Sequence, residues 1–118
     1  EVCVLPGRVD RATALDWYQA LDVFCVPRLD TPVCRLVTPL KPMTAMALGR
    51  PVVASDLPAL REITAPSANR SFPAGDVEAL SRVLTQLAAG APLPSTRQTP
   101  PTWSSNAVRQ AEIYAGLV

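Results

Sequence analysis

Residues 39–56, PLKPMTAMALGRPVVASD, constrain the fold more than any other part of this 118-residue chain. Residues 43–48 are mostly good helix formers, and Gly49 follows them where a left-handed helix cap is expected. Pro42 lies near the start of that helix, where its missing N–H costs nothing. Residues 51–55 are a short apolar run without alternation, typical of a strand that is covered on both faces. A helix followed by a buried strand is half of a βαβ unit, and doubly wound sheets bind phosphates at the start of such helices.

Similar elements precede this stretch. Residues 2–5 are predicted to form a strand, and Asp10 is the expected N-cap of a helix over residues 11–21, whose apolar positions follow the helical period. Residues 23–26 predict a second strand. Residues 28–38 then form a loop that is longer than the usual connection between a strand and a helix, which indicates a functional role.

The elements after the central stretch continue the alternation. Residues 57–63 predict a short helix, residues 71–73 a weak last strand, and residues 77–89 an amphipathic helix capped by Asp76. The fold class expected from this order is α/β: a Rossmann-like, mainly parallel sheet flanked by helices. Residues 90–102 are rich in Pro, Ser and Thr and are predicted to be a linker.

A final helix is expected to start at Ser104 or Ser105. It should pack back on the preceding unit through four apolar side chains, those of Val108, Ile113, Tyr114 and Leu117.

Charge and composition exclude several classes of function. The net charge is +1 and no basic stripe is present, so no nucleic-acid partner is expected. No apolar run reaches the length of a transmembrane segment and no signal peptide is evident, which makes a cytoplasmic location the default. The chain contains no histidine, which excludes serine–histidine catalysis and histidine metal sites within it.

The three cysteines, Cys3, Cys25 and Cys34, lack metal or redox spacing. Cys3 and Cys25 are expected to be buried and inert. Cys34 lies in the long loop and could be exposed. Trp17 and Tyr18 are interpreted as packing residues rather than binding aromatics, since Tyr18 lies on the apolar stripe of its helix.

The segment TPLKPMTAMALGRPVVASDLPALREI resembles the donor-binding signature of retaining GT-B glycosyltransferases of the family 4 (glycosyl transferases group 1) type, which reads roughly TPLKPLEAMAMGKPVVASDVGGLREL in many relatives. The likeness continues in GRVDRATALDWYQALDVFCVPR, FPAGDVEALSRVL and TWSSNAVRQAEIYAGL. The resemblance implies that residues 1–89 are part of a C-terminal, donor-binding lobe. Residues 90–102 would then be a linker, and residues 103–118 a helix that packs back on the lobe.

The activity implied by this resemblance is transfer of a hexose from a UDP- or GDP-sugar to an acceptor, with retention and without a metal or other cofactor. The acceptor would be a glycan, a lipid or a small molecule, held mostly by an N-terminal lobe that this chain lacks. The isolated chain is therefore expected to be inactive. The full enzyme would be cytoplasmic or peripheral to a membrane.

Transfer requires that charge developing on the leaving diphosphate is stabilised, which fixed cations and helix N–H groups do. Five residues are expected to face the diphosphate and sugar: Arg28, Arg35, Thr38, Leu40 and Lys41. For the charged residues the structural alternative is a solvated surface side chain.

Thr44 stands where relatives carry the glutamate that holds the donor ribose, and the family's first acidic position falls on Leu36. A threonine hydroxyl can accept one hydrogen bond without the charge, a loss on the order of 1–3 kcal/mol. Alternatively, Thr44 marks a degenerate, non-catalytic lobe that serves as an interaction or structural module. The lobe of the family normally begins with two more strands, which nothing in this sequence matches, and their absence favours that alternative.

A third hypothesis is another doubly wound nucleotide-binding module, since fold alone does not fix function. Asp30, Asp56 and Glu62 are candidate acids. Asp56 is interpreted as a helix cap and Glu62 as a partner of Arg61 or of a neighbouring loop. No carboxylate pair has a spacing diagnostic of hydrolysis, so no hydrolase is predicted.

Overall fold

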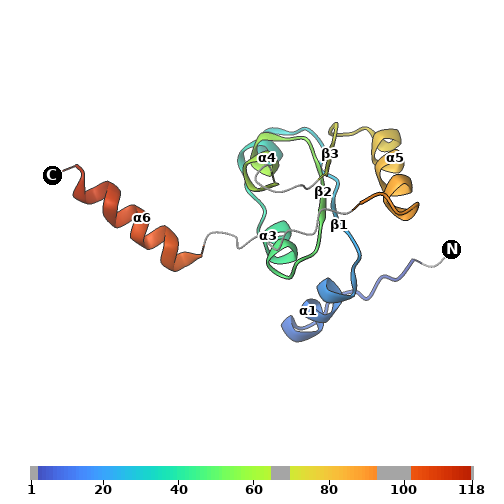
Figure 1. Ribbon diagram of the computed structural model, residues 1–118, viewed down its shortest axis with the longest axis horizontal. Coiled ribbons are helices and arrows are strands. Elements are labelled where there is room, and N and C mark those ends of the chain that lie inside the picture. Colours follow the sequence, from blue (N-terminus) through green and yellow to red (C-terminus); the bar gives the residue numbers. More distant parts are fainter. Residues whose placement is uncertain (1–2, 65–69, 93–101, 118) are drawn as a thin grey trace.

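A parallel sheet of three short strands lies at the centre of the structure (Figure 1). The computed structural model describes residues 3–64, 70–92 and 102–117. The strands are β1 (Phe24–Val26), β2 (Val52–Ser55) and β3 (Arg70–Phe72), in the order β1-β2-β3. Both pairings are parallel, with Cys25 opposite Val53 and Ala54 opposite Ser71. The α/β, mainly parallel fold predicted from the sequence is therefore confirmed.

The middle strand β2 is buried along its whole length. Val52 and Ala54 face α3 (Leu40–Ala47) and α4 (Pro58–Thr64), where they pack with residues such as Met46 and Leu60. Val53 faces the opposite side and packs with Phe72 and with α5 (Val77–Ala88). Figure 1 shows α3 and α4 on one side of the sheet and α5 on the other. The prediction of a strand covered on both faces is confirmed.

Short-range signals set the ends of three helices as predicted. The Asp10 carboxylate accepts a hydrogen bond from the backbone N–H of Thr13 at 2.8 Å and begins α1 (Arg11–Ala20). Asp76 accepts in the same way from Ala79 at 2.8 Å and begins α5. Gly49, with a φ of 74°, ends α3 in the left-handed region, where a side chain would strain the backbone.

Aromatic packing joins α1 to the sheet. The ring of Tyr18 stacks on that of Phe24 in β1, with the ring centroids 5.2 Å apart. Burial also raises the pKa of the Tyr18 hydroxyl. These contacts support the interpretation of Tyr18 as a packing residue.

The N-terminal strand predicted over residues 2–5 is not observed in its described part, residues 3–5. Val4 and Leu5 are 58% and 87% exposed, and Cys3 is exposed rather than buried. An apolar segment of this length becomes a strand only when a neighbouring strand pairs with it, and none of the described strands does. Cys25 and Cys34 are half-buried, and burial raises the pKa of the Cys25 thiol.

The loop predicted over residues 28–38 contains a helix, α2 (Pro32–Leu36). The Thr31 hydroxyl caps it by accepting a hydrogen bond from the N–H of Cys34 at 3.3 Å, and Pro32 occupies the first turn. Five residues are too few to show a helical period, so only the Thr-Pro pair signals this helix in the sequence.

The final helix forms, but its surroundings differ from the expectation. It is α6 (Trp103–Ala115), and a capping box between Thr102 and Ser105 starts it slightly earlier than predicted. The side chains of Val108, Ile113, Tyr114 and Leu117 are 54–76% exposed, so their predicted burial is not observed. In Figure 1 the helix lies apart from the sheet. Most of the predicted linker, residues 93–101, lies outside the described residues.

Among the residues that the structure describes, no helix combines the length and the apolar character that crossing a bilayer requires.

The last residue of β2 is a buried serine, which forms hydrogen bonds with the segment that follows β1. Ser55 is 1% exposed, and its hydroxyl accepts a hydrogen bond from the N–H of Arg28 at 2.7 Å. The same hydroxyl donates to the carbonyl oxygen of Arg28 at 2.9 Å. One side chain thus satisfies both backbone groups of a residue 27 positions earlier.

We expect Ser55→Ala to lower the free energy of unfolding by about 1–3 kcal/mol, because it leaves the backbone groups of Arg28 without their partner. Ser71→Ala, on the exposed side of β3, is the matched control and should change stability by less than about 0.5 kcal/mol. Urea unfolding of the two variants would measure the difference. Equal stabilities would show that the Ser55 bridge contributes nothing.

Candidate functional site

The three parallel strands end at one edge of the sheet, and the predicted site residues lie in the segments that leave this edge. Val26 ends β1, Ser55 ends β2 and Phe72 ends β3. Helices α4 and α5 begin there directly, and α3 begins after α2. Ligands of doubly wound sheets bind at this carboxyl edge, where loops and helix N-termini meet.

Arg28 links the β1 exit to the approach of α3. Its backbone is held by Ser55, and its Nη1 donates to the carbonyl oxygen of Val37 at 3.3 Å. Val37 directly precedes Thr38, another predicted site residue, which is half-buried. Arg28 therefore lies beside the segment expected to bind the donor, and part of its guanidinium is used to hold that segment.

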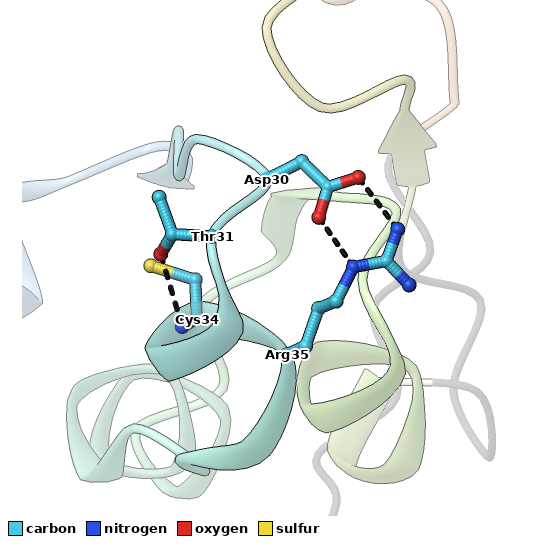
Figure 2. Close-up of polar contacts among 4 residues, drawn as sticks. All are labelled: Asp30, Thr31, Cys34 and Arg35. Atoms are coloured by element: carbon cyan, nitrogen blue, oxygen red, sulfur yellow. Dashed lines mark hydrogen bonds and ion pairs between the residues drawn. The ribbon is translucent and has the colours of Figure 1, made fainter.

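Arg35 is paired with an acid. Its Nε and Nη2 donate to the two carboxylate oxygens of Asp30, at 2.5 and 2.6 Å, across the turn that begins α2 (Figure 2). These hydrogen bonds hold the pKa of Asp30 below its ordinary value, so the carboxylate stays charged. Arg35 thus presents a fixed guanidinium rather than a free one. The sequence-based prediction included both residues but not the contact between them.

The start of α3 exposes Leu40 and Lys41. Leu40 is 74% exposed, and Lys41, the only lysine of the chain, is also exposed. The N-cap residue Pro39 offers no side-chain acceptor, so it makes no capping hydrogen bond to the backbone N–H groups of the first turn. Uncapped N–H groups and an adjacent ammonium are together suited to bind an anion.

Thr44 lies one turn into α3, and its hydroxyl bonds to its own helix. Oγ1 donates to the carbonyl oxygen of Leu40 at 3.4 Å, and the side chain is half-buried. The hydroxyl lone pairs can still accept a hydrogen bond from a ligand hydroxyl. Thr44 therefore offers a ligand a single neutral acceptor.

The contacts of Asp56 and Arg61 differ from those expected. Asp56 does not cap α4. Its carboxylate instead binds Arg61, with Oδ2 2.8 Å from Nη2 and a second contact between Oδ1 and Nε. These hydrogen bonds lower the pKa of Asp56. The partner of Arg61 is thus Asp56 rather than Glu62, which is exposed.

The sequence analysis did not identify Ser55 or Arg61 as residues of this edge. A signal was present for Arg61, because DTPVCR and DLPALR share the pattern Asp-x-Pro-x-x-Arg. For Ser55 the only signal is a lone hydroxyl at the end of an apolar strand, and its partner could not be inferred from sequence spacing.

A hollow of about 130 Å³ lies at the same edge, between the β1 exit and α5. Its walls are mainly apolar and include Leu29, Phe72 and Val77, with Arg28 and Asp76 among the lining residues. Of the predicted site residues only Arg28 lines it. Lys41 and Thr44 belong to α3, which packs on the opposite face of the sheet from α5. The predicted donor site is therefore an open surface at the start of α3 rather than this hollow.

No group of three or more Cys, Asp or Glu side chains within the described residues is arranged to hold a metal ion. The charged groups at the edge are instead arginines, a lysine and three carboxylates, of which Asp30 and Asp56 bind arginine and Asp76 caps α5. Such a set of groups suits a polar, anionic organic ligand.

Two comparisons with known proteins bear on this site. A search of curated proteins found no match. The sequence model of a family described as Glycosyl transferases group 1 matches residues 1–89, which include the whole sheet and all six predicted site residues. On this match, which covers three quarters of the sequence, the chain belongs to the Glycosyl transferases group 1 family.

Proposed function

We propose that the chain is the nucleotide-sugar-binding portion of a glycosyltransferase that transfers a hexose from a UDP- or GDP-sugar to an acceptor, with retention. The observation that carries the proposal is the uncapped start of α3, with Leu40 and Lys41 exposed at the carboxyl edge of the sheet within the region that matches the family. The acceptor is a glycan, a lipid or a small molecule bound by another part of the enzyme.

The proposed arrangement assigns the diphosphate to the first turn of α3. The N–H groups of Leu40 and Lys41 donate to its oxygens, and the Lys41 ammonium supplies a positive charge. Thr38 lies immediately before this turn and offers a hydroxyl to a phosphate or to the sugar. Arg28 and Arg35 add positive charge from the preceding segment. As bonds to the leaving diphosphate break, these groups stabilise the negative charge that develops on it.

Thr44 is assigned to the donor ribose. A glutamate would accept from two vicinal ribose hydroxyls with a full charge, whereas the Thr44 hydroxyl accepts from one. The proposal therefore includes weaker donor binding than in relatives that carry the acid.

One observation favours the second candidate, a degenerate lobe that acts as a non-catalytic interaction module. The Thr44 hydroxyl proton already bonds to Leu40, and no acidic side chain replaces the missing glutamate on α3. Nucleotide binding separates the two candidates, because the degenerate module needs none.

Titration with UDP, GDP and ADP, followed in a two-dimensional amide NMR spectrum, should shift the signals of residues 38–46 for UDP or GDP. Backbone N–H groups that bind a diphosphate change their chemical environment directly, so the amides of Leu40 and Lys41 should move most. A folded spectrum that none of the three nucleotides changes at millimolar concentration would contradict the proposal and favour the degenerate module. A preference for ADP would favour a different nucleotide-binding module.

Lys41→Gln should weaken binding of the preferred nucleoside diphosphate by about tenfold, because a charge-assisted hydrogen bond to phosphate is lost. Arg82→Gln on α5 removes an equal charge away from this edge and serves as the control. Both dissociation constants can be measured by calorimetry at the same ionic strength. A similar small loss in both variants would indicate only a general charge effect and would remove Lys41 from the site.

Thr44→Glu should tighten binding of the preferred ribonucleotide by roughly five- to a hundredfold, the equivalent of about 1–3 kcal/mol from a charged hydrogen bond. The gain should disappear with the 2′,3′-dideoxy form of the same nucleotide, which lacks the hydroxyl groups. Thr44→Gln, of similar length but uncharged, should give a smaller gain. An equal gain for both nucleotides would contradict the assignment of this position to the ribose.

A further inference from the structure

Two strand-to-helix junctions at the carboxyl edge are built alike. The sequence DTPVCR, residues 30–35, follows β1 and begins α2, and DLPALR, residues 56–61, follows β2 and begins α4. In both, the aspartate lies two residues before the first helical residue, a proline, and the arginine is on the fourth helical residue. The two junctions leave neighbouring strands, since β1 pairs with β2.

In each junction the aspartate binds one side of the arginine guanidinium group. Arg35 binds Asp30 and Arg61 binds Asp56, in both cases through Nε and Nη2. A guanidinium has five N–H groups, so three remain on each arginine after these two contacts. Among the described residues, none accepts a hydrogen bond from the three that remain. Both side chains are more than half exposed, which leaves these groups open to a ligand.

The charge of Arg61 lies close enough to Arg35 to act on it. Helix α2 packs against α4, which brings the two junctions together. The hydrogen bond to Asp30 raises the pKa of Arg35, and the positive charge of Arg61 opposes that rise. In Figure 2 the Arg35 side chain extends from α2 alongside the neighbouring helix.

We propose that Arg61 joins Arg35 in binding the diphosphate of the donor, and that Asp30 and Asp56 are positioning residues that orient the two guanidinium groups. The identity of the ligand rests on the proposed function. The two arginines would bind oxygens of the two phosphates through N–H groups that are already fixed in direction. Arginine suits this role because its planar fork can donate two parallel hydrogen bonds to one phosphate.

The ion pairs also have a structural role, since each joins an aspartate two positions before a helix to the fourth residue of that helix. If the ion pairs had only this structural role, replacing Arg61 in a variant that still folds would not change the affinity for an anion. The measurement that separates the two roles is therefore anion binding by folded variants.

Inorganic diphosphate is the probe, titrated into the full chain at low ionic strength by calorimetry. Arg35→Gln and Arg61→Gln should each weaken binding by about tenfold, as expected for loss of charge-assisted hydrogen bonds. Arg82→Gln is the matched control: Arg82 is exposed, lies on α5 and pairs with Glu78 at 3.9 Å. It should change the affinity by less than about twofold. Arg61→Lys retains the positive charge but not the planar guanidinium, so its affinity for diphosphate should lie between those of the wild type and Arg61→Gln. This variant also tests the site if Arg61→Gln does not fold.

Asp56→Asn tests the positioning role. Removing a negative charge near an anion should strengthen binding if only the net charge matters. Loss of orientation should instead weaken it, and we expect weaker binding by severalfold, with Asp30→Asn behaving alike. Stronger diphosphate binding by both variants would overturn the positioning role.

The outcomes distinguish this inference from the proposed function. If Arg61→Gln weakens diphosphate binding no more than Arg82→Gln does, the two-arginine site is wrong, and the proposed function stands wherever UDP or GDP still binds. If both arginine variants weaken diphosphate binding but UDP and GDP bind no tighter than diphosphate, the two-arginine site stands and the nucleotide-sugar function fails. A wild-type chain that does not bind diphosphate overturns the two-arginine site.

Discussion

Burial of β2 on both faces is the constraint on which the rest of the structure depends. Val52 and Ala54 hold α3 and α4 on one side, and Val53 holds α5 on the other. Because β2 pairs in parallel with both neighbours, all three strands end at one edge. Packing of the apolar core therefore determines where the polar groups of the loops lie next to one another. A strand of only four residues serves both the stability of the sheet and the placement of the candidate site.

Features of the fold that depend only on residues close together in the sequence could be predicted. Asp10, Asp76 and Gly49 act within one turn of a helix, so the sequence itself contains their partners. Residues 3–5 have the composition of a strand, but strand formation needs a pairing edge that the sequence does not reveal. The exposure of α6 is a similar case, because an apolar stripe indicates what a helix can bury and not whether anything lies against it.

The candidate site likewise contains some features that the sequence predicts and others that it does not. The exposed start of α3 follows from the order of elements, and the sequence located Leu40 and Lys41 there. The partners of Arg35 and Arg61 could not be read from the familiar helical spacings, because each acid lies five residues earlier and outside the helix. The sequence analysis instead interpreted Glu62, the residue next to Arg61, as a partner of Arg61 or of a neighbouring loop. The contact of Ser55 with Arg28 spans 27 residues and depends on the strand register.

The Ser55 hydroxyl donates to and accepts from one backbone residue, as a peptide group of a neighbouring strand would. It thus acts as one more rung of the β1–β2 ladder, placed just after β1 ends at Val26. Since this rung recognises the main chain of Arg28 and not its side chain, the place of this residue at the exit of β1 does not depend on which side chain it carries. That position is therefore free to change with the ligand, while the backbone that presents it stays the same.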